Sequence, residues 1–365
     1  MGSFIVPDRA YLEVAGKDAV KIVHSVSTND ITDLSRHGDC IATAFLTPKG
    51  RILADAIVYN TTPASEGPAV TRLLIETHKA VSPQLMKFLV MYRLRSVATI
   101  KAVEYETKIL TGSDQAKADP SALVSKDPRG SELGSRSLVP LAGGKNGESF
   151  QDIDRSMYMR YRMLHGIAEG PEIVNKIPLE CNLDMLNYIS FSKGCYVGQE
   201  LVARTKHKGV VRKRILPFLR SLTTTEGAEE TIPFAVLDSK LAGAIASSTV
   251  IDVPPVGNTR YVVKGDTLVG QDSDSGVVLA TTRGQELGLA LLRLDSVLPA
   301  DKEENDGTGK TDAQQADSAR GNARLIVKRG EADDVKSVDG AAVRVFRPPW
   351  WPDADPVTGR SMLTA

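Results

Sequence analysis

The chain is poor in cysteine and aromatic residues, carries no net charge and has no long apolar run. It has 365 residues with 45 basic and 45 acidic side chains, so its formal net charge is zero. Without an overall positive field we expect no nucleic-acid partner. No apolar run approaches the roughly 18 residues of a membrane-spanning helix, and we therefore expect no membrane insertion.

The three cysteines, Cys40, Cys181 and Cys195, are too few for a disulfide framework and are odd in number. At least one thiol stays free, which is typical of a reducing compartment. None belongs to a Cys-x-x-Cys pair, which argues against a self-contained zinc site. No signal peptide or Arg-rich leader is visible at the start of the sequence.

Hydrophobic residues make up 42% and charged residues 25% of the chain, which is typical of a globular protein with a core. At roughly 100–200 residues per domain, the length predicts two or three domains. We expect an α+β region over 1–210, with an irregular insertion at about 111–150 where Gly, Ser, Asp, Lys and Pro accumulate. Short strands between Gly-rich turns predict an antiparallel β-barrel domain over 211–365, with a disordered insertion at about 301–323.

The pattern of apolar residues predicts several elements of the first region. Helical spacing from Ala19 to Val26 indicates a short amphipathic helix, with Asp18 placed to cap it. Cys40–Leu46 and Ile52–Tyr59 read as strands, joined by a Pro-Gly-containing turn. Ser82 and the proline that follows it suit the start of a second helix. In the second region, strands are expected at 215–219, 261–263, 277–281, 287–294, 325–327 and 343–346.

The stretch around Cys195 carries the strongest chemical signal. It reads Lys193-Gly194-Cys195-Tyr196-Val197-Gly198-Gln199-Glu200, and Arg204 and His207 follow in a basic cluster. Positive charges close to a thiol favour the thiolate, which is the nucleophile and the metal ligand. The plain alternative is a buried cysteine beside a solvated basic face.

One thiol limits what such a site can do. An iron–sulfur cluster usually takes about four protein ligands, so Cys195 could hold one only by sharing it with another protein. As a catalytic nucleophile Cys195 would need a base, and His207 is the histidine closest to it in sequence. Both alternatives stay open at this point.

The signature Lys193–Glu200 resembles that of the folate-binding-like family related to the glycine-cleavage T-protein, an aminomethyltransferase. Within it, the chain is most similar to the branch of mitochondrial iron–sulfur cluster assembly factors that act late in making [4Fe–4S] proteins. The similarity covers most of the chain except the insertions. Further segments carry it: 27–30, 45–55, 91–95, 127–129, 161–170, 201–214 and 347–352.

The resemblance implies three subdomains in a ring, two of them from the first region and the third from the barrel. It implies a mitochondrial matrix protein, made with a transit peptide, whose partners are A-type cluster carriers; free of them, we expect a monomer. Cys195 would then be the ligand to a [2Fe–2S] cluster bridging the two proteins. Gly194, Gly198 and Gln199 would shape the loop, and Lys193 with Arg204 would stabilise the negative charge. The remaining signature residues are Tyr196, Val197 and Glu200, and of these Tyr196 and Glu200 are expected at the site.

The chain departs from the aminomethyltransferases at one point. They carry paired aspartates after the strand turn, one of them catalytic, whereas this segment reads Ile-Leu-Ala-Asp-Ala and keeps only Asp55. Asp55 could be structural, capping a turn or pairing with Arg51. The alternative functions are a tetrahydrofolate-dependent one-carbon transferase, with Asp55 and Glu180 as acid–base groups, and a folate-binding scaffold. Whether tetrahydrofolate binds is left open.

Overall fold

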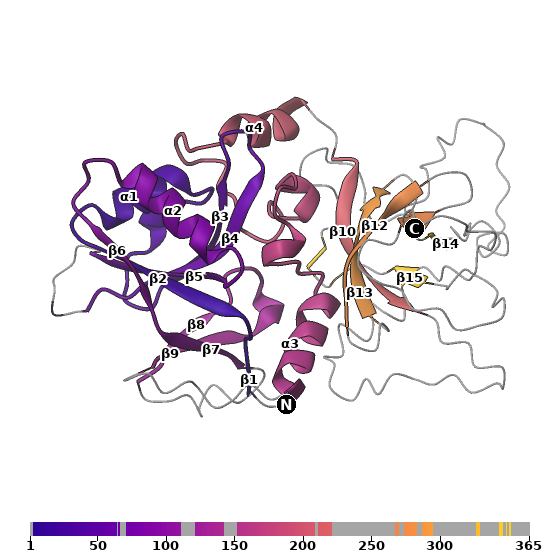
Figure 1. Ribbon diagram of the computed structural model, residues 1–365, viewed down its shortest axis with the longest axis horizontal. Helices are drawn as coiled ribbons and strands as arrows, with labels where there is room; N and C mark the ends of the chain where they lie inside the picture. Colours follow the sequence, from indigo (N-terminus) through magenta and orange to yellow (C-terminus); the bar gives the residue numbers. More distant parts are fainter. Residues whose placement is uncertain are drawn as a thin grey trace, which may run out of the picture. The chain divides into compact units, whose positions relative to one another are not determined.

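The chain divides into two units, each with its own antiparallel sheet structure (Figure 1). The first unit comprises Met1–Arg162 and Ala168–Gly209, and the second comprises Met163–Ile167 and Val210–Ala365. The computed structural model describes residues 3–63, 65, 71–110, 121–141, 152–208, 211–220, 267–269, 274–282, 287–294, 326–328, 343–345, 348, 350 and 351.

A five-stranded antiparallel sheet, ordered β3-β4-β5-β2-β6, forms the larger sheet of the first unit. Two helices, α1 and α2, lie side by side on one of its faces (Figure 1). The sequence predicted both helices and the hairpin that joins β3 to β4. The elements are β2 (Arg9–Ala15), α1 (Ala19–Val26), β3 (Cys40–Leu46), β4 (Ile52–Asn60), β5 (Arg72–His78), α2 (Ser82–Arg93) and β6 (Thr99–Val103).

The core between this sheet and its helices forms because apolar side chains recur at helical spacing in α1. Ala19, Ile22, Val23 and Val26 are all buried, and side chains three and four residues apart share one helix face. Asp18 takes the N-cap position but makes no side-chain cap bond. Its carboxylate accepts the N–H of Val97 at 2.6 Å instead, so it ties α1 to the segment before β6.

The second helix begins one residue earlier than the prediction of Ser82 as its cap implied. Val81 is the N-cap and Ser82 is the first helical residue, with a proline in the first turn. Leu85, Phe88 and Leu89 are buried against the sheet. The helix ends at Arg93, and its C-cap is Leu94, which has a φ of 50° and is 82% exposed.

A four-stranded antiparallel sheet, ordered β1-β7-β9-β8, completes the sheets of the first unit. Two of its strands lie inside the predicted irregular insertion, so residues 121–141 are ordered as part of a sheet; 111–120 and 142–150 lie outside the described residues. The remaining elements are β1 (Ser3–Ile5), η1 (Ile31–Asp33), β7 (Tyr105–Leu110), β8 (Leu123–Lys126), η4 (Ser131–Leu133), β9 (Ser135–Pro140), α3 (Asp152–Leu164), η6 (Gly170–Glu172), η7 (Leu179–Cys181) and α4 (Gln199–Lys208).

The second unit holds a six-stranded antiparallel sheet, ordered β14-β11-β12-β13-β10-β15. Among its described strands β14 and β15 are the edges, and no pairing closes the sheet into the predicted barrel. The expected strand at 261–263 and the expected insertion at 301–323 lie outside the described residues. The strands are β10 (Lys213–Arg220), β11 (Thr267–Val269), β12 (Asp274–Thr281), β13 (Leu287–Arg293), β14 (Ile326–Lys328) and β15 (Val343–Val345).

Separate helices and antiparallel sheets confirm the α+β class. In the portion of the chain that the structure describes, no helix is long and apolar enough to cross a bilayer.

Candidate functional site

The thiol of Cys195 lies at the surface, in the loop that leads into α4. Cys195 and Gly194 are both exposed, and a Cβ added to Gly194 would meet no atom within 4 Å. Cys181 is buried, and Cys40 is half-buried with its Sγ donating to the carbonyl of Lys126 at 3.3 Å. Burial raises the pKa of the Cys40 thiol to about 12. Of the three thiols, Cys195 is therefore the one open to a second molecule.

Among the described residues, Cys195 has no companion side chains that would complete a metal site. Over the described ranges, no group of three or more His, Cys, Asp or Glu side chains could hold a metal ion. His207 is exposed on α4, and its participation as a ligand or a base stays a prediction. An iron–sulfur cluster usually takes about four protein ligands, which the described residues around this thiol do not supply.

Lys193, two residues before the thiol, points into the protein. Its side chain is 7% exposed, and its Nζ donates to the carbonyl oxygens of His24 at 2.6 Å, Ser27 at 2.7 Å and Asn29 at 3.2 Å. An ammonium group has three protons, so these carbonyls can accept them all. Burial lowers the pKa of Lys193 to about 8, against the opposing attraction of Asp30.

The signature residues after Cys195 fix the turn into α4. Tyr196 is buried, and burial raises the pKa of its hydroxyl to about 12. Gly198 has a φ of 80°, and an added Cβ would lie 2.5 Å from the carbonyl oxygen of Thr47, in the β3–β4 turn. Only glycine allows both this conformation and this close approach. Gln199 is half-buried and begins α4, and Glu200 is exposed in its first turn, where a carboxylate suits the helix dipole.

The exposed face of α4 continues the surface around the thiol. Glu200, Arg204 and His207 are all exposed and stand at positions i, i+4 and i+7, which share one side of a helix. Lys206 places its Nζ 3.2 Å from the centroid of the Phe191 ring. Phe191 is 43% exposed, so an apolar ring with a cation over it lies four residues before Cys195.

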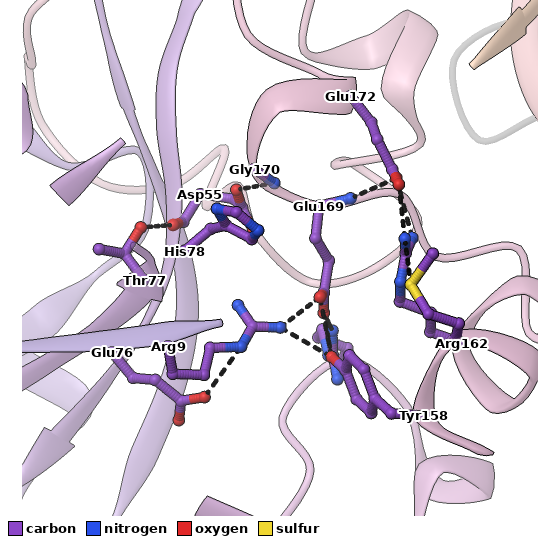
Figure 2. A network of polar contacts seen from close by, with 12 residues as sticks. Arg9, Asp55, Glu76, Thr77, His78, Tyr158, Arg162, Glu169, Gly170 and Glu172 are labelled. Atoms are coloured by element: carbon purple, nitrogen blue, oxygen red, sulfur yellow. Dashed lines mark hydrogen bonds and ion pairs between the residues drawn. The ribbon is translucent and has the colours of Figure 1, made fainter. Parts of the chain in front are cut away.

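Asp55, the residue considered for acid–base work, is buried in β4 (Figure 2). Its Oδ1 accepts the backbone N–H of Gly170 at 2.7 Å, so it fixes the start of η6 rather than pairing with the neighbouring Arg51. Burial and the nearby Glu169 raise the pKa of this carboxyl to about 6. Asp55 is 3% exposed, and its catalytic role in a transferase stays a prediction.

A buried network of ion pairs lies next to Asp55 (Figure 2). Arg9 pairs with Glu169 and, through Nε at 3.5 Å, with Glu76. The hydroxyl of Tyr158 donates to Glu169 at 2.7 Å. Burial alone would raise the pKa of Glu169. The guanidinium groups of Arg9, Arg129 and Arg162 instead hold this pKa well below its usual range.

Arg129 and Arg136 extend this network into the four-stranded sheet. Arg129 bonds Asp127 through two nitrogens, at 2.9 and 2.8 Å, and reaches Glu169 at 2.5 Å. Arg136 bonds Asp127 at 3.1 Å and Glu76 at 2.6 Å. Burial opposes the charge on Asp127, yet these two guanidinium groups lower the pKa of that carboxyl.

The first unit thus contains two separate sets of polar groups, one at the surface around Cys195 and one in the buried arginine–carboxylate network. The Cys195 loop and α4 carry the site residues that the sequence predicted. The buried arginine–carboxylate network was not predicted as a unit. One available signal was Glu76 directly after the apolar run of β5, because a carboxylate inside a buried strand requires a cation close to it.

The comparisons with known proteins identify relatives along most of the chain. No family model matches it. It is 28% identical over 382 residues to the iron–sulfur cluster assembly factor IBA57 homologue, mitochondrial, of Mycosarcoma maydis, covering 96% of this chain and 85% of that protein. It is 34% identical over 252 residues to human mitochondrial IBA57, covering 61% of this chain and 68% of the relative. The Neurospora crassa homologue is 37% identical, and the chain spans 54% of its length.

A solved structure resembles the whole chain. The glycine cleavage system aminomethyltransferase T of Bartonella henselae matches with a TM-score of 0.59, covering 99% of this chain and 87% of that one. At 12% identity this similarity shows the fold alone, which is aminomethyltransferase-like, and does not show the activity.

Proposed function

Because the chain belongs to the family of IBA57 mitochondrial iron–sulfur cluster assembly factors, we propose that it acts with an A-type cluster carrier in the mitochondrial matrix to mature [4Fe–4S] proteins. Cys195 supplies one ligand to a [2Fe–2S] cluster, and the carrier supplies the others. The cluster is cargo on its way to client proteins, so the chain works as a binding partner rather than as an enzyme.

One observation carries this proposal: a single exposed thiol without companion ligands. Cys195 is open to solvent, and the described part of the chain contains no group of metal-binding side chains. A cluster held only by this chain would lack most of its ligands. A cluster shared between two proteins needs from this one no more than an accessible sulfur.

The surface around the thiol supports a protein partner with acidic side chains. Arg204, His207 and the lysine that contacts Phe191 stand along α4, with Glu200 as the one acidic residue of that exposed face. Such a cluster steers a partner of opposite charge and orients it. The exposed ring of Phe191 offers an apolar contact next to the thiol, as aromatic residues do in many interfaces.

The placement of Asp55 argues against the transferase alternative. An acid–base group must reach the reacting atom, whereas Asp55 is buried with its Oδ1 bonded to Gly170. We derive no aminomethyl transfer from this arrangement. Tetrahydrofolate binding, the closed C-terminal barrel and the ring of three subdomains stay proposals, supported by the aminomethyltransferase-like fold.

Anaerobic reconstitution tests the proposed function. The chain, which we expect to be a monomer by size exclusion, is mixed with an A-type carrier, iron and sulfide. We expect a heterocomplex that absorbs in the thiolate-to-iron region. Cys195→Ala should abolish the complex, whereas Cys40→Ala, the control at a half-buried thiol, should preserve it.

An intact spectrum and complex with Cys195→Ala would refute the assignment of this cysteine. A titration with tetrahydrofolate, followed by tryptophan fluorescence, separates the alternatives. Tight folate binding with turnover of an aminomethyl donor would favour the transferase, and folate binding without any cluster complex would favour the scaffold.

A further inference from the structure

The loop that carries Cys195 is fixed at both of its ends. On the amino side, Ser190 donates its N–H to the carbonyl of Thr28 at 3.0 Å, and the Thr28 hydroxyl donates to the carbonyl of Tyr188 at 2.6 Å. On the other side, Gly198 lies so close to the β3–β4 turn that a Cβ would not fit. We call residues 190–198 the presenting loop.

Lys193 adds an attachment inside the presenting loop, at the carboxyl end of α1. Two of its acceptors, the carbonyls of His24 and Ser27, belong to the last turn and the C-cap of that helix. These carbonyls have no partner within the helix and form the negative pole of its dipole. The third acceptor, the carbonyl of Asn29, lies just beyond. Bonds from a charged donor to such groups are stronger than bonds between neutral groups.

The ammonium group is therefore engaged by the backbone. Its three protons have three carbonyl acceptors within 3.2 Å, and its Nζ also lies 5.1 Å from the centroid of the Tyr196 ring. Gly194 and Cys195, between Lys193 and Tyr196, are the exposed residues of this stretch. Lys193 and Tyr196, the buried residues on either side of this exposed pair, thus contact each other, and Lys193 also binds the end of α1.

We infer that Lys193 is a positioning residue: by binding the carboxyl end of α1, its ammonium group holds the presenting loop so that the thiol of Cys195 projects outward. This differs from the sequence-based expectation, in which the charge of Lys193 stabilises the cluster directly. The attachment of the presenting loop by Lys193 is a property of the free protein. The effect of this attachment on cluster binding rests on the proposed function.

Hydrogen exchange on the free full-length protein tests this attachment. Lys193→Met removes the ammonium and retains a side chain of similar length. We expect the amides of Ser190 and Lys193 to exchange at least tenfold faster in the variant, with β4 amides unchanged. Lys21→Met, which removes an exposed ammonium from α1 itself, is the control and should leave the loop amides as in the wild type. Unchanged exchange in Lys193→Met would overturn the inference.

Alkylation separates positioning from direct charge stabilisation. The rate of iodoacetamide labelling at Cys195, resolved by peptide mass spectrometry, is measured as a function of pH. If Lys193 only positions the loop, Lys193→Met should leave the pH midpoint of labelling as in the wild type. A midpoint displaced to higher pH, with unchanged exchange, would show that the charge acts on the sulfur and would overturn the inference.

Lys193→Arg keeps the charge and provides a second variant if Lys193→Met fails to fold. A planar guanidinium cannot direct three protons from one nitrogen, so positioning predicts intermediate exchange rates. Wild-type exchange in Lys193→Arg together with wild-type cluster binding would contradict a positioning role.

The cluster-bridged complex tests the consequence. We expect Lys193→Met to weaken it at least tenfold while the remaining complex keeps the wild-type spectrum, and Lys193→Arg to restore affinity in part. Wild-type affinity in Lys193→Met would refute the consequence. If Cys195→Ala also binds normally, the proposed function fails, whereas the exchange result on the free protein still decides the role of Lys193.

Discussion

The buried carboxyl of Asp55 makes a specific prediction about stability and pH. Its pKa is about 6 in the folded chain against a reference value of 3.8, because burial and Glu169 disfavour the charged form. Between these two values the folded state binds a proton that the unfolded state has released. The free energy of unfolding contributed by Asp55 is therefore fully present below about pH 3.8 and is lost as the pH rises through 6.

The size of the effect follows from the same two values. At about 1.36 kcal/mol per pKa unit, the difference corresponds to about 3 kcal/mol in total. About 2 kcal/mol of this loss falls between pH 4.5 and pH 7.5. Asp55→Asn removes the titration, and its amide oxygen still accepts the N–H of Gly170. Whatever constant penalty the new amide adds, the variant should gain about 2 kcal/mol on the wild type across that interval.

Urea unfolding of both proteins at several pH values, followed by circular dichroism, measures this difference. Asp33→Asn removes an exposed carboxyl and serves as the control for losing one negative charge. A constant difference between Asp55→Asn and the wild type across the interval would refute the reasoning, because it would mean that Asp55 is ionised in the folded protein well below pH 6.

Three further outcomes follow from the structure. Gly198→Ala places a Cβ 2.5 Å from the Thr47 carbonyl oxygen at a φ of 80°. It should lower the unfolding free energy by about 1–3 kcal/mol and weaken the carrier complex, whereas Gly194→Ala, in open space, should leave the unfolding free energy as in the wild type. Arg136→Met leaves two buried carboxylates without this partner and should lower the urea midpoint by an amount equivalent to about 3–5 kcal/mol. Leu94 is exposed and has a backbone φ in the positive region. Leu94→Gly relieves this strain and should stabilise the fold by about 1 kcal/mol, measured as a raised melting temperature. A lowered melting temperature would show that Leu94 is unstrained.

The sequence predicted those parts of the fold in which a period in the chain coincides with burial. Helix α1 shows this, since four apolar residues at helical spacing are the four that the core covers. Asp18 takes the predicted N-cap position without a side-chain cap bond, because its carboxylate has a distant partner that a local pattern does not show. Its carboxylate bonds Val97, 79 residues away. The unclosed order of the described strands in the second sheet was missed for the same reason, because closure depends on pairings between segments that are distant in the sequence.

The candidate site shows the same division. The freedom of Gly198 to adopt a positive φ followed from a short contiguous motif. The exposure of the Cys195 thiol did not, because a buried cysteine beside a basic face fitted the same residues. The acceptors of Lys193 lie 164–169 residues away, so nothing near Lys193 in the sequence indicates that its charge is directed inward. The arginine–carboxylate network joins Arg9 to Glu169, 160 residues apart, and no spacing rule spans that distance.

The two sets of polar groups differ in what they can bind. In the network, each carboxylate already accepts from a buried guanidinium, and adding a ligand there would break ion pairs whose loss leaves unpaired buried charge. In the presenting loop, the lysine is satisfied by the backbone while the thiol is exposed, so a second protein can reach the sulfur without displacing an internal partner. The proposed cluster binding therefore needs none of the buried carboxylates of this aminomethyltransferase-like fold. The thiol of Cys195 lies on the presenting loop, outside the arginine–carboxylate network.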